Sequence, residues 1–248
     1  MGQMLVEIAL LVGLFLGIAA AGVTQVLAGT GVRLLVPPLA ILVCGHAEGL
    51  RIALTLGLLI SVVTFLSERH RVPFGEFWRL ALPAALAAPV WVLLVWLLPS
   101  SIAARLAGLV VVLAVVATVL GVRTGRLVGR PGTIGAGVLG SGLFALGGVG
   151  GPVFGSYARD NDWPEPQAKA VVNATIAVAQ VTVLGFMGLP NPLKAGFPVG
   201  LLGLAVGLVL GMVAVRKLPK LSVPRARTIA IVLAGLAGVA LLVIGTLI

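Results

Sequence analysis

Two clusters of glycine and proline contain the residues of this sequence that are best suited to bind a ligand. The first is AGTGVRLLVPP at residues 28–38, and the second is GGVGGPVFGSY at residues 147–157. Glycines let a helix open, and the helix that restarts presents N–H groups and the positive end of its dipole. Two such helix starts would suit a small anion, although glycines also serve close helix packing in membranes. The predicted backbone groups of the site belong to Gly29, Thr30, Gly31, Gly148, Gly150 and Gly151.

Side chains near these clusters would add hydrogen-bond donors. Arg33 is a charge at predicted membrane depth, where charges are costly and functional by default, and its guanidinium is a fork of donors for a sulfonate or carboxylate. The alternative is that Arg33 extends to the membrane surface or pairs with Glu48. Asn173 and Thr175 lie near the start of the helix after the second cluster, and Thr55 is their rough counterpart in the first half. For these three the alternative is a hydrogen bond between helices.

Ion coupling and catalysis have weak signals in this sequence. His46 and Glu48 would make a proton relay, but their place beside a predicted loop favours a solvated pair. Arg51 and Lys169 stand at helix starts, where they would attract anions or anchor loops. Two isolated histidines cannot form an H-E-x-x-H motif, and the single cysteine, Cys44, argues against a thiolate metal site. We therefore predict no enzyme activity, no metal and no cofactor.

The elements that position these residues are membrane-spanning helices. The chain has 248 residues, of which 60% are hydrophobic and 10% charged, whereas soluble domains carry about 25% charged residues. A spanning helix needs about 20 apolar residues, and the continuous apolar runs exclude a β-barrel. The net charge of +10 fits basic cytoplasmic loops better than nucleic-acid binding. The composition therefore predicts an all-α integral membrane protein, and the abundance of Ala, Gly, Val and Arg suggests a bacterial one.

Apolar runs and their breakers predict ten helical segments. The Gly-rich second and seventh segments are short and interrupted. The segments are Leu5 to Ala28, Gly29 to Val43, Glu48 to Leu66, Phe77 to Leu98, Ile102 to Gly121, Thr133 to Leu146, Gly147 to Ala158, Glu165 to Gly188, Phe197 to Val215 and Arg227 to Ile248.

The two halves of the sequence resemble each other. Matched features, such as the Leu-Pro that ends a long apolar segment at Pro99 and at Pro219, recur at an offset of about 115 to 122 residues. Repeated hydrophobic segments with broken helices in matching positions are typical of secondary transporters. The sequence thus predicts a membrane repeat at 1–122, a basic cytoplasmic linker at 123–132 and a second membrane repeat at 133–248.

Basic loops predict the orientation of these segments. Arginine and lysine gather in three loops, around residues 69–79, 123–130 and 216–227, which the positive-inside rule places in the cytoplasm. If each broken segment returns to the side from which it came, each repeat crosses the membrane a net three times. The repeats are then inverted and both termini lie outside the cytoplasmic membrane. The acidic loop at 159–169 is the weakest point of this topology, but acidic residues count little in the rule.

At the second cluster the chain resembles the sulfite exporter family TauE/SafE, a family of small bacterial anion permeases. That family carries a motif near G-x-G-G-P in its second repeat, present here from Gly148 to Pro152, and a motif near G-x-G-G-G-x-x-x-x-P in its first. The first motif is only partly kept, because Val32 and Arg33 replace two of its glycines. The resemblance covers the whole chain through its repeat layout. It implies transport of sulfite, organosulfonates or related small anions.

The sequence therefore favours a permease that works by alternating access at a site where the two clusters converge near the membrane midplane. The alternatives are an anion channel, or a carrier of other small oxyanions or carboxylates. A purely structural subunit would leave the matched breaks unexplained, since such breaks cost stability. The expected partners are a small anion and the lipid bilayer, with no nucleic acid, and an exposed helix face would support a homodimer.

Overall fold

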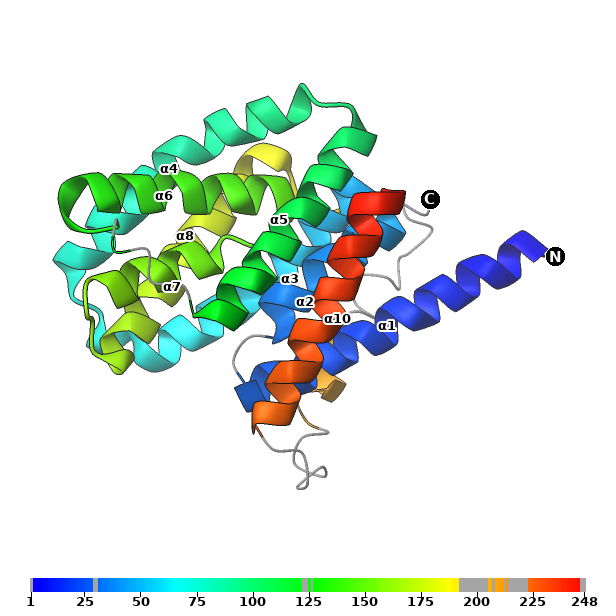
Figure 1. Cartoon of the computed structure of the whole chain (residues 1–248), viewed down its shortest axis with the longest axis horizontal. Helices are drawn as coiled ribbons and strands as arrows, with labels where there is room; N and C mark the ends of the chain where they lie inside the picture. Colours follow the sequence, from blue (N-terminus) through cyan, green and yellow to red (C-terminus); the bar gives the residue numbers. More distant parts are fainter. Residues whose placement is uncertain are drawn as a thin grey trace. The chain divides into compact units, whose positions relative to one another are not determined.

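A computed structural model describes residues 2–28, 31–121, 125, 127–191, 205–206, 208–211, 213 and 223–245, and every regular element in these residues is helical (Figure 1). The predicted all-α fold is confirmed for this part of the chain. The predicted segment Phe197 to Val215 lies mostly outside the described residues. The elements are α1 (Gly2–Ala28), α2 (Gly31–Cys44), α3 (His46–Glu68), a 3-10 turn η1 (Arg69–Arg71), α4 (Phe74–Trp96), α5 (Ser100–Leu120), α6 (Gly129–Gly147), α7 (Gly151–Asp160), α8 (Glu165–Met187) and α10 (Val223–Ile244).

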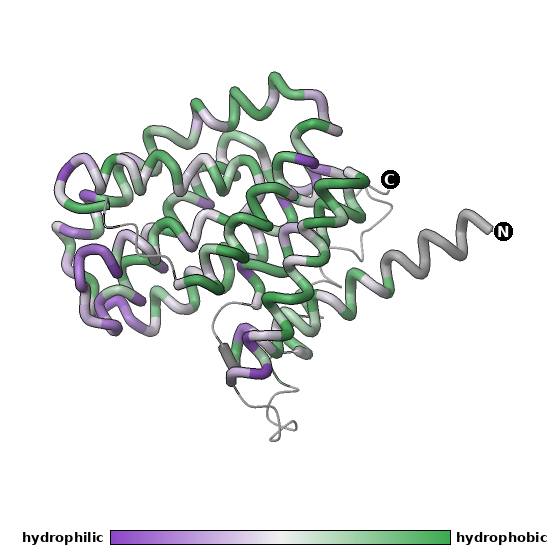
Figure 2. Tube along the Cα trace, viewed as in Figure 1, coloured by the Kyte–Doolittle hydropathy of each residue, from purple (hydrophilic) through white to green (hydrophobic). Residues whose placement is uncertain are grey.

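Among the described residues, five helices are long and apolar enough to cross a membrane: α3, α4, α5, α8 and α10. Apolar residues cover most of their length, and hydrophilic residues gather at helix ends and connections (Figure 2). Large apolar side chains on these helices are exposed, Leu86 of α4 and Leu236 of α10 among them. Such side chains need hydrocarbon around them rather than water. The chain is therefore a helical membrane protein.

By their internal contacts the residues form two compact units. Unit 1 comprises Met1–Ala53, Ser100–Val115 and Pro190–Ile248, and unit 2 comprises Leu54–Pro99 and Val116–Leu189. Each unit contains segments of both predicted repeats. This is no contradiction, because a unit is defined by contacts in space and a repeat by similarity along the sequence. The repeat boundaries at 122, 132 and 133 therefore stay a prediction.

Small residues bring the helices of unit 1 close together. Helices α1, α2 and α10 pack on one another, and most of the residues of α2 are buried. At Gly108 of α5 an added Cβ would lie 2.5 Å from the backbone nitrogen of Leu242 in α10. Glycine at this position is therefore what lets α5 and α10 touch at the backbone.

In unit 2, α4 packs against α6 and α8, and α7 packs against both α6 and α8. The contact of α4 with α6 is very close, since a Cβ on Gly137 would lie 2.7 Å from Pro83 and one on Gly142 would lie 2.6 Å from the Trp91 ring. The indole N–H of Trp91 donates a hydrogen bond to the Val138 carbonyl, 3.0 Å away. Glycines on α6 thus leave the space into which Pro83 and Trp91 of α4 pack.

Candidate substrate site

The second glycine cluster interrupts the chain between α6 and α7, as predicted. Helix α6 ends at Gly147, and Gly148 adopts a left-handed φ of +71°. Its N–H donates to the Phe144 carbonyl at 3.0 Å. After Gly150 the chain restarts as α7, a helix of only 10 residues with no side-chain cap at its N-terminus. Of the first residues of α7, Pro152 has no N–H and Val153 donates its N–H to the Gly150 carbonyl at 3.2 Å, so the Gly151 N–H is the one that the start of the helix presents.

Helix α7 returns antiparallel along α6. The Phe144 and Phe154 rings stack with centroids 6.3 Å apart. Nearer the far end of the pair, the hydroxyls of Thr133 and Tyr157 lie 2.9 Å apart. The broken segment thus runs back along the helix before it, and the side of the membrane on which it ends stays a prediction.

Side chains at the end of α7 hold the start of the hairpin. The Leu127 N–H donates to the Asp160 carboxylate at 3.3 Å, and the Asn161 amide donates to the Leu127 carbonyl at 2.8 Å. Both backbone groups of Leu127 are thereby satisfied. The chain entering α6 is thus tied to the chain leaving α7, which fixes the base of the hairpin.

The glycines of this cluster have different roles. Gly148 supplies the left-handed turn. A Cβ on Gly150 would collide with the Gly140 carbonyl and the Phe144 ring, so this glycine is needed for packing. Among the described residues, a Cβ on Gly151 would meet the Ile176 side chain of α8 alone, at an ordinary 3.6 Å. Gly151 is therefore the position at the start of α7 where the fold leaves space.

The first cluster forms a second hairpin, between α1 and α2. Gly29 and Thr30 lie outside the described residues, so their predicted roles stay predictions. Helix α2 begins at Gly31, where a Cβ would collide with the Ala21 carbonyl and the Thr24 hydroxyl of α1. The Val32 N–H donates to the Gln25 side-chain oxygen at 3.2 Å, which satisfies one backbone group of the new helix.

Pro37 and Pro38 of the first cluster both lie inside α2 and do not end it, contrary to the general expectation that an internal proline breaks a helix. Each lacks one backbone N–H, but spanning proteins tolerate this where neighbouring helices pack closely. Both prolines are buried. The two prolines therefore do not account for the interruption between α1 and α2.

The two hairpins make the same contact at matched positions. Gly31 sits over the Ala21 carbonyl in unit 1, and Gly150 sits over the Gly140 carbonyl in unit 2. Gly31 and Gly150 are 119 residues apart, and so are Ala21 and Gly140. The longer helices keep this offset, because α3 and α8 are both 23 residues long and both their first and their last residues are 119 positions apart.

The structure divides the predicted side-chain donors between the units. Arg33 is half-buried in the first turn of α2, in unit 1. Thr55 of α3 and Asn173 and Thr175 of α8 belong to unit 2, with Gly151. Asn173 is buried, and its amide donates to the Lys169 carbonyl at 2.6 Å.

Thr175 holds a buried polar group that the fold does not satisfy. Its side chain is fully buried, and among the described residues no hydrogen-bond partner reaches its hydroxyl. Other helical threonines bond to the carbonyl four residues earlier, as Thr64 does with Ile60 at 2.8 Å and Thr182 with Val178 at 2.9 Å. An unmet buried hydroxyl costs about 1–3 kcal/mol. Thr175 is thus a donor available to a ligand, as its predicted role requires.

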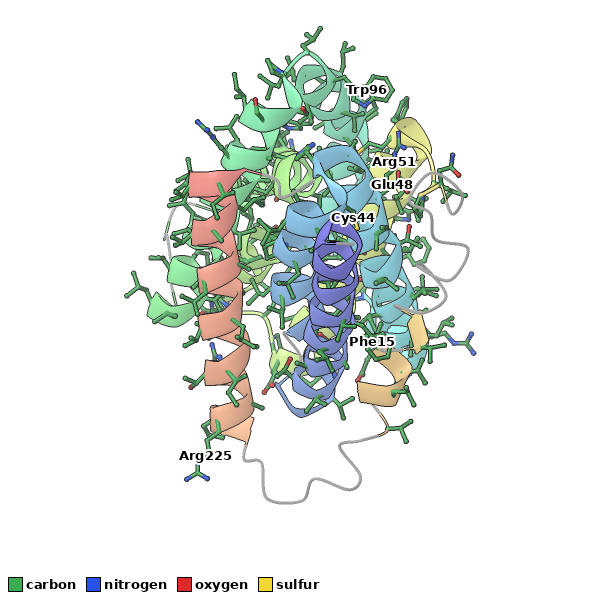
Figure 3. The ribbon with its side chains drawn as sticks, turned by 90° about the vertical axis from the view of Figure 1, so that its right-hand side faces the viewer. Phe15, Cys44, Glu48, Arg51, Trp96 and Arg225 are labelled. Carbon is green, nitrogen blue, oxygen red and sulfur yellow. The ribbon has the colours of Figure 1, made fainter. Side chains whose placement is uncertain are left out.

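Charged residues at the ends of α3 and α8 pair with other charges. Glu48 accepts from the Arg51 guanidinium at 3.4 Å and from the Asn191 N–H at 2.7 Å, and Figure 3 shows Glu48 and Arg51 side by side near Cys44. Lys169 pairs with Glu68 at 3.3 Å. These contacts favour the loop-anchoring alternative for Arg51 and Lys169 over anion attraction.

Sequence reasoning misses one buried polar contact in unit 2. Ser61 of α3 lies with its hydroxyl 3.1 Å from the side-chain oxygen of Gln180 and 2.9 Å from the Gly57 carbonyl. Both side chains are buried. Ser61 looks unremarkable within an apolar run, and only its separation of 119 residues from Gln180 would have singled it out.

Within the described residues, no group of three or more His, Cys, Asp or Glu side chains is placed to hold a metal ion. The fold and its spans define the class of protein: a helical membrane protein with two hairpins that place a glycine on a backbone carbonyl at matched positions. No family model, curated protein or solved structure matches the chain. The chemistry of its residues therefore carries the functional argument.

Proposed function

We propose that the protein is a secondary transporter of small anions in a bacterial cytoplasmic membrane. The observation that carries this proposal is the matched pair of hairpins, in each of which a glycine near the start of the second helix sits on a backbone carbonyl of the helix before it. Broken helices at corresponding positions of two halves are the best structural pointer to a transporter's binding site. A structural subunit would gain nothing from interrupting two buried helices.

The contacts of α3 with α8 support inverted repeats. Glu68, the last residue of α3, pairs with Lys169 near the start of α8, while Ser61 lies against Gln180, deeper along both helices. The two helices are therefore antiparallel. Both are long enough to span the membrane and lie 119 residues apart in the chain, so an antiparallel pair is what inverted repeats would produce.

The chemistry of unit 2 supports an anionic substrate. The N-terminus of α7 offers the backbone N–H of Gly151 and the positive end of a helix dipole. Gly151 leaves space beside it, and the buried hydroxyl of Thr175 is a further donor on α8. Sulfite and small organosulfonates, the substrates implied by the resemblance to the TauE/SafE family, have oxygens that accept such bonds.

The experiment that tests this proposal is anion flux into proteoliposomes of the purified protein. The panel contains sulfite, sulfoacetate, taurine, sulfate and small carboxylates, each with and without a pH gradient. We expect saturable flux of sulfite or a sulfonate, accelerated by the same anion on the opposite side. Flux that rises linearly with concentration and lacks counterflow would favour the anion channel. Flux of carboxylates alone would move the substrate class away from sulfur anions. No flux of any anion would reject transport.

A further inference from the structure

The contact between Ser61 and Gln180 joins two matched positions. The offset of 119 residues relates α3 to α8 at both ends, and it also separates Ser61 from Gln180. In an isologous arrangement two copies of the same position meet only at the two-fold axis that relates them. The pair, which lies within unit 2, therefore marks the point where a local two-fold axis between α3 and α8 passes.

The direction of that axis follows from a second contact. Toward the end of α3, Glu68 lies against Lys169, which matches Leu50 rather than Glu68. In an antiparallel pair, matched positions meet only where the helices cross, and all other contacts join unlike positions. The axis is thus perpendicular to both helices at Ser61 and Gln180.

The crossing point itself is not symmetric. Gly57, one turn before Ser61, has no side chain, and the Gln180 amide nitrogen lies 2.5 Å from where its Cβ would be. The matched position on α8 is Ile176, whose large buried side chain lies against Gly151. Gln180 therefore has room over α3, and a glutamine at Ser61 would lack the same room over α8. The neighbouring side chains therefore specify that the long residue of the pair lies on α8 and the short one on α3.

This asymmetry bears on the transport cycle, and the inference rests on the proposed function. In a carrier with inverted repeats, the two access states exchange the conformations of the repeats. A contact between unlike positions, such as Glu68 against Lys169, has a counterpart in which the two repeats are exchanged. Where the two helices depart from exact symmetry, one of these two contacts forms in one access state and its counterpart in the other. A contact between matched positions is converted into itself. We propose that the Ser61–Gln180 contact persists in both access states and is the pivot of the cycle. The two residues are positioning residues that need not touch the anion.

The test compares two crosslinks in a Cys44→Ala background, which removes the only cysteine. One variant carries Ser61→Cys and Gln180→Cys, and the control carries Glu68→Cys and Lys169→Cys. Each is bridged with bifunctional methanethiosulfonates of graded length, and bridging is measured by mass. We expect the bridged pivot pair to keep its sulfite flux within about twofold of the unbridged protein. The bridged control pair should lose sulfite flux about tenfold or more, because a cycle limited by conformational change stops when a moving contact is fixed. A reductant should restore the control.

Two results would overturn the pivot. One is a bridged Ser61–Gln180 pair that blocks flux as fully as the control, and the other is a bridged control that transports normally. The proposed function fails separately, if the unbridged protein carries none of the panel anions. In that case spin labels give a readout without flux: at Glu68 and Lys169 we expect two distances, and at Ser61 and Gln180 one. Two distances at the crossing point would also reject the pivot.

Discussion

Neighbouring glycines in one motif have opposite structural requirements. Gly150 is packed against the Gly140 carbonyl and the Phe144 ring, while in the described part of the chain a Cβ on Gly151 would have the Ile176 side chain alone within 4 Å. The sequence identifies both as candidates for a close backbone approach. The sequence cannot show which of the two glycines tolerates a side chain, because the atoms that surround them belong to α6 and α8, at a distance from the motif in the chain.

Alanine at these two glycines should separate packing from binding. We expect Gly150→Ala to destabilise the protein by about 1–3 kcal/mol through overpacking, visible as a lower melting temperature in detergent. Gly151→Ala should leave the melting temperature unchanged but raise the KM for the transported anion about tenfold, since its methyl group would stand beside the α7 N-terminus. An unchanged KM for Gly151→Ala would remove this helix start from the site.

The unmet hydroxyl of Thr175 gives a second test at the residue scale. Thr175→Val keeps the shape and removes the hydroxyl, so we expect stability to stay level or rise by about 1 kcal/mol, while the KM for the anion rises. Thr182→Val is the matched control on the same helix, because the hydroxyl of Thr182 already bonds to Val178. Equal kinetics for the two variants would show that the Thr175 hydroxyl does not bind the substrate.

At the scale of elements, the apolar pattern predicts most helix boundaries closely. The segment predicted from Glu165 to Gly188 is found at Glu165–Met187, because a polar start and a glycine stop bound a long apolar run. Helix α6 starts earlier than the predicted Thr133, at Gly129. Its Pro131 is tolerated because it lies in the first turn, and Leu127 is held by α7. That hold is a tertiary contact, which local patterns do not reveal.

The two faces of α6 differ in their tolerance of a methyl group. Gly137 faces α4, where a Cβ would lie 2.7 Å from Pro83, whereas a Cβ on Gly135 would meet only the Leu127 side chain at 4.0 Å. We expect Gly137→Ala to lower stability by about 1–3 kcal/mol and Gly135→Ala to raise it by about 0.5–1 kcal/mol, because alanine is the better helix former. Melting temperatures in detergent measure both, and a stabilising Gly137→Ala would contradict the close α4–α6 packing.

At the scale of the whole molecule, the sequence predicts the repeat through its offset, and the structure adds which matched positions touch. The predicted donors fall into both compact units, with Arg33 in unit 1 and Thr175 in unit 2. A sequence pattern cannot reveal whether such groups converge on one ligand, because convergence depends on how helices pack. For this reason the glycine turns were predictable, and the Ser61–Gln180 crossing was not.

Opposite orientation of the two halves is what the transport proposal needs most, and it can be measured without knowing the substrate. Ala47 and Pro166 are matched positions, 119 residues apart, and both are exposed at the starts of α3 and α8. Each is replaced singly by cysteine in the Cys44→Ala background, in cells and in inverted membrane vesicles. A membrane-impermeant thiol reagent then reports the side on which each lies. We predict that the Ala47→Cys variant reacts from outside and the Pro166→Cys variant from the cytoplasmic side. Reaction of both from the same side would contradict inverted repeats, and with them the proposed mechanism of alternating access.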